Sequence, residues 1–137
     1  MLKISACVIT KNEEKNIGRW LDCMRQLADE MIVVDTGSTD ATVELAQAAG
    51  AKVCHFSWCD DFAAAKNFAL EQANGDWILF LDADEYFEPA SLPLVRQYIL
   101  RYQAQHQVIG IMCQLLDFDQ DDHDRLLRIC YQARIFR

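Results

Sequence analysis

The chain has 137 residues, of which 52% are hydrophobic and 25% charged, and its formal net charge at pH 7 is −8. This length suits one domain with a single hydrophobic core. Because the chain holds 21 acidic residues and only 13 dispersed basic ones, nucleic acid is not expected as a partner. No apolar run reaches the roughly 18 residues of a transmembrane helix, and the N-terminus lacks the pattern of a signal peptide. We therefore expect a cytoplasmic domain without a transmembrane segment.

Six cysteines are spread along the chain without a CxxC pair. A zinc site built on Cys54, His55 and Cys59 would lack a second pair of ligands. Disulfide frameworks are typical of small secreted domains, and no secretion signal is present. The cysteines are therefore predicted to be free thiols.

The first 81 residues alternate between strand-like and helix-like segments. Short apolar runs predict strands at 3–9, 31–35, 51–56 and 77–81. Amphipathic patterns predict helices from Asn12 as N-cap to about Leu27, from Ala41 to Ala49, and from Asp60 or Asp61 to about Asn74. In the last of these helices Phe62, Ala65, Ala69 and Ala73 are expected on the inner face. This order predicts an α/β fold with a mainly parallel sheet flanked by helices.

Carboxylates follow two of the predicted strands. Asp35 follows the second strand, and Asp82, Asp84 and Glu85 follow the fourth. Right-handed crossovers bring the carboxyl ends of parallel strands to one edge of the sheet. Ligands of open α/β sheets bind at that edge. We therefore expect these carboxylates to lie close together although they are far apart in the sequence.

The pattern changes after Pro89. Residues 91–105 predict a helix, with Ser91 as a possible cap and Pro93 in its first turn. Residues 108–118 and 125–136 predict two strands joined by the acidic turn Asp119–Asp124. This arrangement is typical of a hairpin.

Three stretches carry a family resemblance. They are ACVITKNEEKNI (6–17), IVVDTGSTDAT (32–42) and DFAAAKNFALEQANGDWILFLDADE (61–85). In this order and at this spacing they resemble the N-terminal half of an inverting family 2 glycosyltransferase with the GT-A fold. The resemblance covers nearly all of Ile4 to Phe87. It implies a single GT-A-like, Rossmann-like domain over residues 1–137 with a C-terminal strand hairpin, truncated at its C-terminus.

The resemblance gives the acidic cluster a role. Asp82-Ala83-Asp84 would be the DXD motif, which holds a divalent metal, Mn²⁺ or Mg²⁺, against the diphosphate of a nucleotide-sugar donor. Such hard cations prefer carboxylate oxygens. Asp84 is expected to bind the metal directly, and Asp82 to bind the ribose, or the metal through water. The alternative is a polar turn that ends a strand, and Glu85 could support the metal or only extend that turn.

Other residues are expected at the nucleotide. Asp35 matches the family's base-binding carboxylate, which can accept from an N–H such as that of uracil. Thr10 and Glu13 lie beyond the first strand, where the family also holds the nucleotide. Lys66 stands where family members often have arginine and could reach a phosphate, although lysine lacks the arginine fork. The alternatives are structural: a turn cap for Asp35, a helix charge for Glu13 and a surface position for Lys66.

The general base is missing from the resemblance. An inverting transferase needs a carboxylate that deprotonates the acceptor hydroxyl, and the family supplies it from the second half of the domain. The tail ARIFR resembles the strand before that region, so the general base is expected beyond residue 137. Asp117 and the aspartates of the 119–124 turn are interpreted as hairpin residues. The acceptor, whether glycan, lipid or protein, stays open.

The predicted function is metal-dependent transfer of a sugar from a nucleotide-diphosphate donor, most simply a UDP-sugar, with inversion. The alternative is a non-catalytic or truncated nucleotide-sugar binding module that lacks the general base. A haloacid-dehalogenase-like phosphatase is disfavoured because its DxD follows the first strand. A Rossmann dehydrogenase is disfavoured because no GxGxxG follows the first strand.

Overall fold

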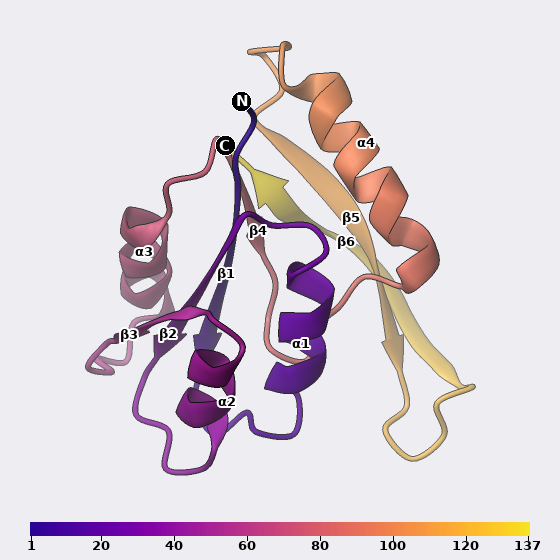
Figure 1. Cartoon of the computed structure of the whole chain (residues 1–137). Helices are drawn as coiled ribbons and strands as arrows, with labels where there is room; N and C mark the ends of the chain where they lie inside the picture. Colours follow the sequence, from indigo (N-terminus) through magenta and orange to yellow (C-terminus); the bar gives the residue numbers. More distant parts are fainter.

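A computed structural model describes the whole chain, residues 1–137, as one six-stranded sheet flanked by helices (Figure 1). The strands are β1 (Ile4–Thr10), β2 (Glu30–Asp35), β3 (Lys52–His55), β4 (Trp77–Phe80), β5 (Gly110–Phe118) and β6 (Leu126–Phe136). The helices are α1 (Ile17–Met24), α2 (Thr42–Ala48), α3 (Phe62–Gln72) and α4 (Leu92–Tyr102), with a 3-10 turn at Pro89–Ser91.

The spatial order of the strands is β3-β2-β1-β4-β6-β5. The first four strands pair in parallel, with β1 between β2 and β4. Strand β6 pairs antiparallel with β4, and β5 pairs antiparallel with β6. The predicted α/β fold, with a mainly parallel sheet and a C-terminal hairpin, is therefore confirmed.

The helices cover the two faces of the sheet unequally. Helices α1, α2 and α4 pack on one face, where Trp20, Met24, Val95 and Ile99 join a core of 19 buried residues. Helix α3 packs on the other face, where Ala69 joins a smaller core of six. Figure 1 shows α3 at the left of the view, beside β1 and β2 and far from α4 and the hairpin. The hairpin therefore receives a helix on one of its faces only.

The predicted start of the first helix is wrong. Asn12 has a left-handed φ of 56° instead of a cap conformation, and α1 begins at Ile17. The side-chain oxygen of Asn12 accepts the Thr39 backbone N–H at 2.8 Å, and the Glu13 N–H donates to the Thr42 hydroxyl. Because these bonds tie Asn12 to the loop after β2 and Glu13 to the first residue of α2, the helix begins only after them.

The predicted inner face of α3 is correct for its alanines and wrong for Phe62. Ala65 and Ala69 are fully buried, whereas the Phe62 side chain is 68% exposed. Asp61 caps the helix by accepting the backbone N–H groups of Ala63 and Ala64. Phe62 is the first residue of the helix, and its ring packs edge-on against Trp58 at a centroid distance of 4.7 Å instead of entering the core.

None of the four helices combines the length and the apolar character that a bilayer crossing requires. The six cysteines are free thiols, and Cys7 and Cys23 are buried.

Candidate functional site

The carboxyl ends of three adjacent strands form the candidate site. Thr10 ends β1 directly opposite Asp35, which ends β2. On the other side of β1, Phe80 ends β4 opposite Cys7, so Asp82 follows at about the level of the last residues of β1. Neighbouring strands lie about 4.8 Å apart, so the backbones at Asp35 and Asp82 are separated by roughly 10 Å. The structure thus brings both carboxylate positions to one edge of the sheet.

Asp35 is a buried, fully bonded carboxylate. Its side chain accepts hydrogen bonds from the backbone N–H groups of Gly37 and Ser38, and from the hydroxyls of Ser38 and Thr10. Burial by itself would raise the pKa of Asp35, but the bonds from Ser38, Gly37 and Thr10 outweigh it and lower the pKa. Asp35 is therefore ionised near neutral pH, and it shapes the loop that follows β2.

His55 is a neighbour of Asp35 that sequence reasoning missed. Its Nδ1 lies 3.9 Å from a carboxylate oxygen of Asp35, and its side chain is largely exposed. Its place at the end of β3, next to β2 in the sheet, was the available signal. A protonated His55 would add a weak attraction to the Asp35 carboxylate.

Glu13 lies on the loop between β1 and α1, as expected. Its carboxylate accepts the side-chain amide of Asn16 at 2.9 Å, and its backbone carbonyl accepts the N–H groups of Asn16 and Ile17. These contacts give Glu13 a local role at the entrance of α1.

The acidic residues after β4 form a tight turn. The Glu85 N–H donates to the Asp82 carbonyl at 3.0 Å, and the Asp82 N–H donates to the Glu85 carboxylate at 3.0 Å. Ala83 is buried in the core between the exposed Asp82 and Asp84. The small buried residue therefore anchors the turn while the two carboxylates on either side remain in solvent.

Arg134 of β6 reaches this turn, which the sequence did not predict. Its guanidinium lies 2.6 Å from the Glu85 carboxylate and 3.3 Å from that of Asp82. Burial alone would lower the pKa of Arg134, but the two carboxylates outweigh it and raise the pKa. No pattern in the sequence pairs residues 85 and 134. The resemblance of the ARIFR tail to a family strand was the nearest signal.

Lys66 lies on the exposed side of α3. Its ammonium is 5.2 Å from the centre of the Phe80 ring, at the end of β4. This position is that of a surface lysine. It also places a cation beside Phe80, which precedes Asp82 by two residues in the sequence.

The donor atoms of the acidic turn suit a hard divalent cation. Asp82 and Asp84 offer exposed carboxylate oxygens from a fixed backbone turn. The structure contains no group of three or more His, Cys, Asp or Glu side chains that could hold a metal ion. A magnesium-like ion typically takes one or two carboxylates and completes its shell with phosphate oxygens and water. Two carboxylates therefore fit an ion that binds together with a diphosphate.

The α/β fold with acidic residues at the carboxyl edge of its sheet can be compared with known proteins. The family model described as Glycosyl transferase family 2 matches residues 5–136. The chain therefore belongs to glycosyl transferase family 2.

Two curated relatives illustrate the similarity. An uncharacterized glycosyltransferase of Rickettsia bellii is 39% identical over 120 residues, which cover 88% of this chain and 40% of the relative. The lipopolysaccharide core biosynthesis glycosyltransferase LpsC of Rhizobium meliloti is 33% identical over 114 residues, covering 80% of this chain and 40% of the relative. The chain thus spans less than half the length of the curated relatives it matches.

Solved structures confirm the GT-A fold. The 1–349 structure of S. aureus TarS superposes with a TM-score of 0.63 at 29% identity, covering 74% of this chain and 33% of that one. Glucosyl-3-phosphoglycerate synthase from Mycobacterium tuberculosis, solved in complex with UDP, gives a TM-score of 0.60 at 26% identity. That match covers 81% of this chain and 43% of the synthase.

Proposed function

We propose that the chain is the donor-binding part of an inverting, metal-dependent glycosyltransferase that uses a nucleotide-diphosphate sugar, with a UDP-sugar as the first candidate. The observation that carries the proposal is the acidic turn, where Asp82 and Asp84 present exposed carboxylates at the ligand edge of the sheet. Family membership and the likeness to a synthase solved with UDP support the choice of donor.

Asp84 would hold the metal directly, and Asp82 would hold it through water or bind the ribose. A Mn²⁺ or Mg²⁺ ion bound there would neutralise the diphosphate that leaves during sugar transfer. The turn contributes by holding the backbone at the two aspartates before the ligand arrives. Lys66 would approach a phosphate from the α3 side.

Thr10 and Asp35 would lie beneath the nucleobase, and Glu13 would hold the loop that borders it. The four hydrogen bonds that Asp35 accepts use the positions a carboxylate offers. A uracil N–H would therefore replace the hydroxyl of Thr10 or Ser38, each of which can rotate away. The two backbone N–H groups would keep the carboxylate in place during this exchange.

A second candidate function is nucleotide-sugar binding without turnover. The aspartates of the 119–124 turn support it, because Asp119 accepts the backbone N–H groups of Asp121 and Asp122 and thus serves the hairpin. In that case the chain would bind the nucleotide sugar without supplying a general base. Hydrolysis of a UDP-sugar by this chain would favour the catalytic function over the binding function.

Calorimetric titration of UDP with and without Mn²⁺ tests the proposal. We expect binding only with the metal, and we expect Asp84→Asn to abolish it while the melting temperature stays unchanged, because Asp84 is an exposed turn residue. Asp124→Asn, an exposed aspartate of the hairpin turn, is the matched control and should bind as the original chain does. Metal-dependent binding that survives Asp84→Asn would show that the metal assignment is wrong. A folded chain that binds none of UDP, GDP and dTDP would rule out the donor site.

A further inference from the structure

Arg134 enters the acidic turn because of an irregularity in the hairpin. Ile111 pairs with Ile135, but the next residue, Met112, pairs with Ala133, so Arg134 has no partner on β5. Such a bulge redirects the side chain of the extra residue. On its other edge β6 pairs with β4 just before the acidic turn, with Leu79 opposite Ile135. The bulge therefore places a cation where β4 delivers its carboxylates.

The two ion pairs of Arg134 differ in kind. Its pair with Glu85 is short, at 2.6 Å, and both side chains are nearly buried, with 13% and 12% exposed. Its pair with Asp82 is longer, at 3.3 Å, and the Asp82 side chain is 58% exposed. An exposed pair of this length contributes little and exchanges easily, whereas breaking a buried pair is costly. Glu85 thus anchors the guanidinium, and Asp82 shares it with solvent.

Glu85 is committed to this anchoring task. One carboxylate oxygen bonds Arg134 and the other accepts the Asp82 backbone N–H at 3.0 Å. Each oxygen therefore already accepts one hydrogen bond within the protein. The buried Nε of Arg134 has no hydrogen-bond partner in the structure.

We propose that Arg134 is a diphosphate-binding residue that pairs with Asp82 when no donor is bound and transfers this pairing to a phosphate oxygen when a metal-bound diphosphate arrives. The inference rests on the proposed donor site. A guanidinium matches phosphate oxygens better than any other cationic side chain, because its donors form a planar fork. The anchor to Glu85 keeps the group in place, so little side-chain entropy is lost on binding.

If Arg134 has this role, removing its charge should change the affinity for the metal and the affinity for the nucleotide in opposite directions. A positive charge beside Asp82 repels a metal ion that binds alone and attracts a diphosphate. Arg134→Met should therefore bind Mn²⁺ alone about threefold or more tightly, and should bind UDP at saturating Mn²⁺ about tenfold more weakly. A residue with a structural role alone would weaken both when removed. Arg134→Lys keeps the charge without the fork, so its Mn²⁺ affinity should stay unchanged and its UDP affinity should be intermediate.

The experiment measures Mn²⁺ affinity by electron paramagnetic resonance and UDP affinity by calorimetry at saturating Mn²⁺, on the full chain and its variants. Because Arg134→Met leaves Glu85 nearly buried without its partner, the double variant Glu85→Gln with Arg134→Met keeps the net charge and protects the fold. The matched control is Arg128→Met, on the same strand, which breaks an exposed ion pair with Asp117 at 3.5 Å. We expect the control to bind both ligands unchanged.

The outcomes separate this inference from the proposed function. UDP affinity that is equal in the original chain, Arg134→Met and the double variant would overturn the role of Arg134 while the donor site stands. Parallel weakening of Mn²⁺ and UDP binding would also overturn it and leave a structural role. If the original chain binds Mn²⁺ but no nucleoside diphosphate, the proposed function fails together with the phosphate contact, and tighter Mn²⁺ binding by Arg134→Met would support only the pairing with Asp82.

Discussion

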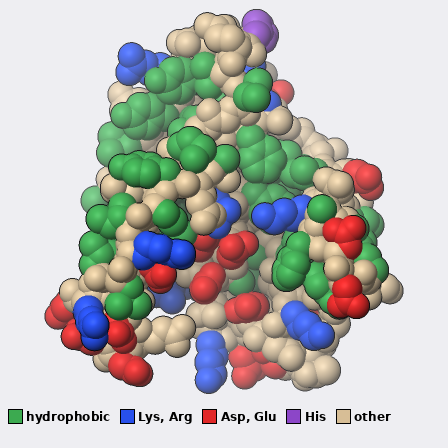
Figure 2. Space-filling model, turned by 180° about the vertical axis from the view of Figure 1, so that it is seen from behind, with side chains coloured by type: hydrophobic (Ala, Val, Ile, Leu, Met, Phe, Trp, Pro, Cys, Tyr) green, Lys and Arg blue, Asp and Glu red, His purple; other side chains and the backbone are tan.

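The two halves of the sheet differ in how far their side chains are buried. In the parallel half, the inner strands β1, β2 and β4 are buried on both faces, and Val8, Ile32 and Leu79 have no exposed surface, whereas the edge strand β3 is only partly buried. In the hairpin, large apolar side chains on one face remain exposed: Met112 59%, Leu116 39%, Ile129 52% and Tyr131 64%. Figure 2 shows the molecule from behind, where hydrophobic side chains gather on the side that holds the hairpin.

The two halves differ in what they contribute. The parallel half stabilises the fold, whereas the hairpin supplies a charged group to the site. Strands covered on both faces define where their ends lie, and the parallel half therefore fixes Thr10, Asp35 and the acidic turn. The hairpin adds one charged group to the site, Arg134, through a bulge near the point where β6 meets β4. We expect substitutions in the parallel half to act on the fold and those in the outer hairpin to leave it nearly unchanged.

The largest expected effect is a cavity in the parallel half. Leu79→Ala removes a fully buried side chain from β4 and should lower the free energy of unfolding by about 2–5 kcal/mol. Leu116→Ala on β5, where the side chain is 39% exposed, should cost less than about 1 kcal/mol. Urea denaturation measures both. Equal losses would mean that the hairpin is as tightly packed as the parallel half.

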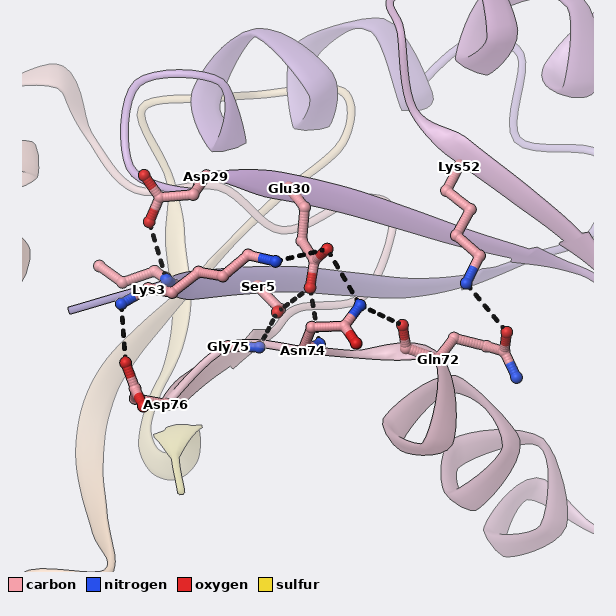
Figure 3. Close-up of polar contacts among 10 residues, drawn as sticks. Lys3, Ser5, Asp29, Glu30, Lys52, Gln72, Asn74, Gly75 and Asp76 are labelled. Atoms are coloured by element: carbon pink, nitrogen blue, oxygen red, sulfur yellow. Dashed lines mark hydrogen bonds and ion pairs between the residues drawn. The ribbon is translucent and has the colours of Figure 1, made fainter. Parts of the chain in front are cut away.

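Adding a methyl group at two glycines should give a smaller difference in stability between the halves. Gly75 precedes β4 in the parallel half, and Gly110 begins β5 of the hairpin. A Cβ on Gly75, just before β4, would lie 2.6 Å from the backbone nitrogen and the hydroxyl of Ser5. Figure 3 shows Gly75 beside Ser5. Gly75→Ala must shift the backbone and should cost about 1–3 kcal/mol. In Gly110→Ala the nearest atom, the Ile135 carbonyl oxygen, would lie at 3.3 Å, so the same denaturation experiment should show a smaller loss.

The same division decided what the sequence could predict. The parallel strands were predictable because strands covered on both faces are continuous apolar runs, and the Asp61 cap was predictable because it is local. Asn12 misled because its side chain bonds Thr39 across the chain, a contact that no local pattern encodes. Phe62 misled because helical spacing alone does not show that the ring of this first helical residue packs against Trp58 instead of the core.

The residues of the candidate site also differ in how far the sequence could predict them. The carboxylates at 82 and 84 were predictable from a motif next to an apolar strand, since their place depends on β4 alone. Arg134 depends on a bulge and on strand pairing between distant segments, and period-two alternation says nothing about either. Whether these groups bind a metal and a nucleotide remains a prediction for the titrations above.

Acidification should reveal a polar contact in the parallel half. Burial tends to raise the pKa of Glu30, but hydrogen bonds from Ser5, Asn74 and Lys3 outweigh it and lower the pKa from 4.5 to about 2. Figure 3 shows this network joining β1, β2 and the loop before β4. Because the folded-state pKa is below the unfolded one, the stabilisation is present above pH 4.5 and is lost as the pH falls toward 2.

The expected loss over this range is about 2 kcal/mol, after allowance for the partly exposed side chain. Thermal denaturation at several pH values would measure it, and Glu30→Gln should flatten the profile between pH 4.5 and 2. Asp117→Asn removes an ion pair with Arg128 whose side chains are 48% and 63% exposed, so it should leave the profile nearly unchanged. A steep profile in Glu30→Gln would assign the acid sensitivity to other carboxylates.

The smallest effect is expected on the open face of the hairpin. Ile129→Thr keeps a β-branched side chain, which suits a strand, and replaces an apolar surface that is 52% exposed. The free energy of unfolding should change by no more than about 0.5 kcal/mol, because little apolar area leaves a buried environment. Denaturation at two protein concentrations measures this and detects self-association. A loss above about 1.5 kcal/mol that is independent of protein concentration would show that Ile129 packs within the chain. The hairpin face would then not be more loosely packed than the parallel half at this residue.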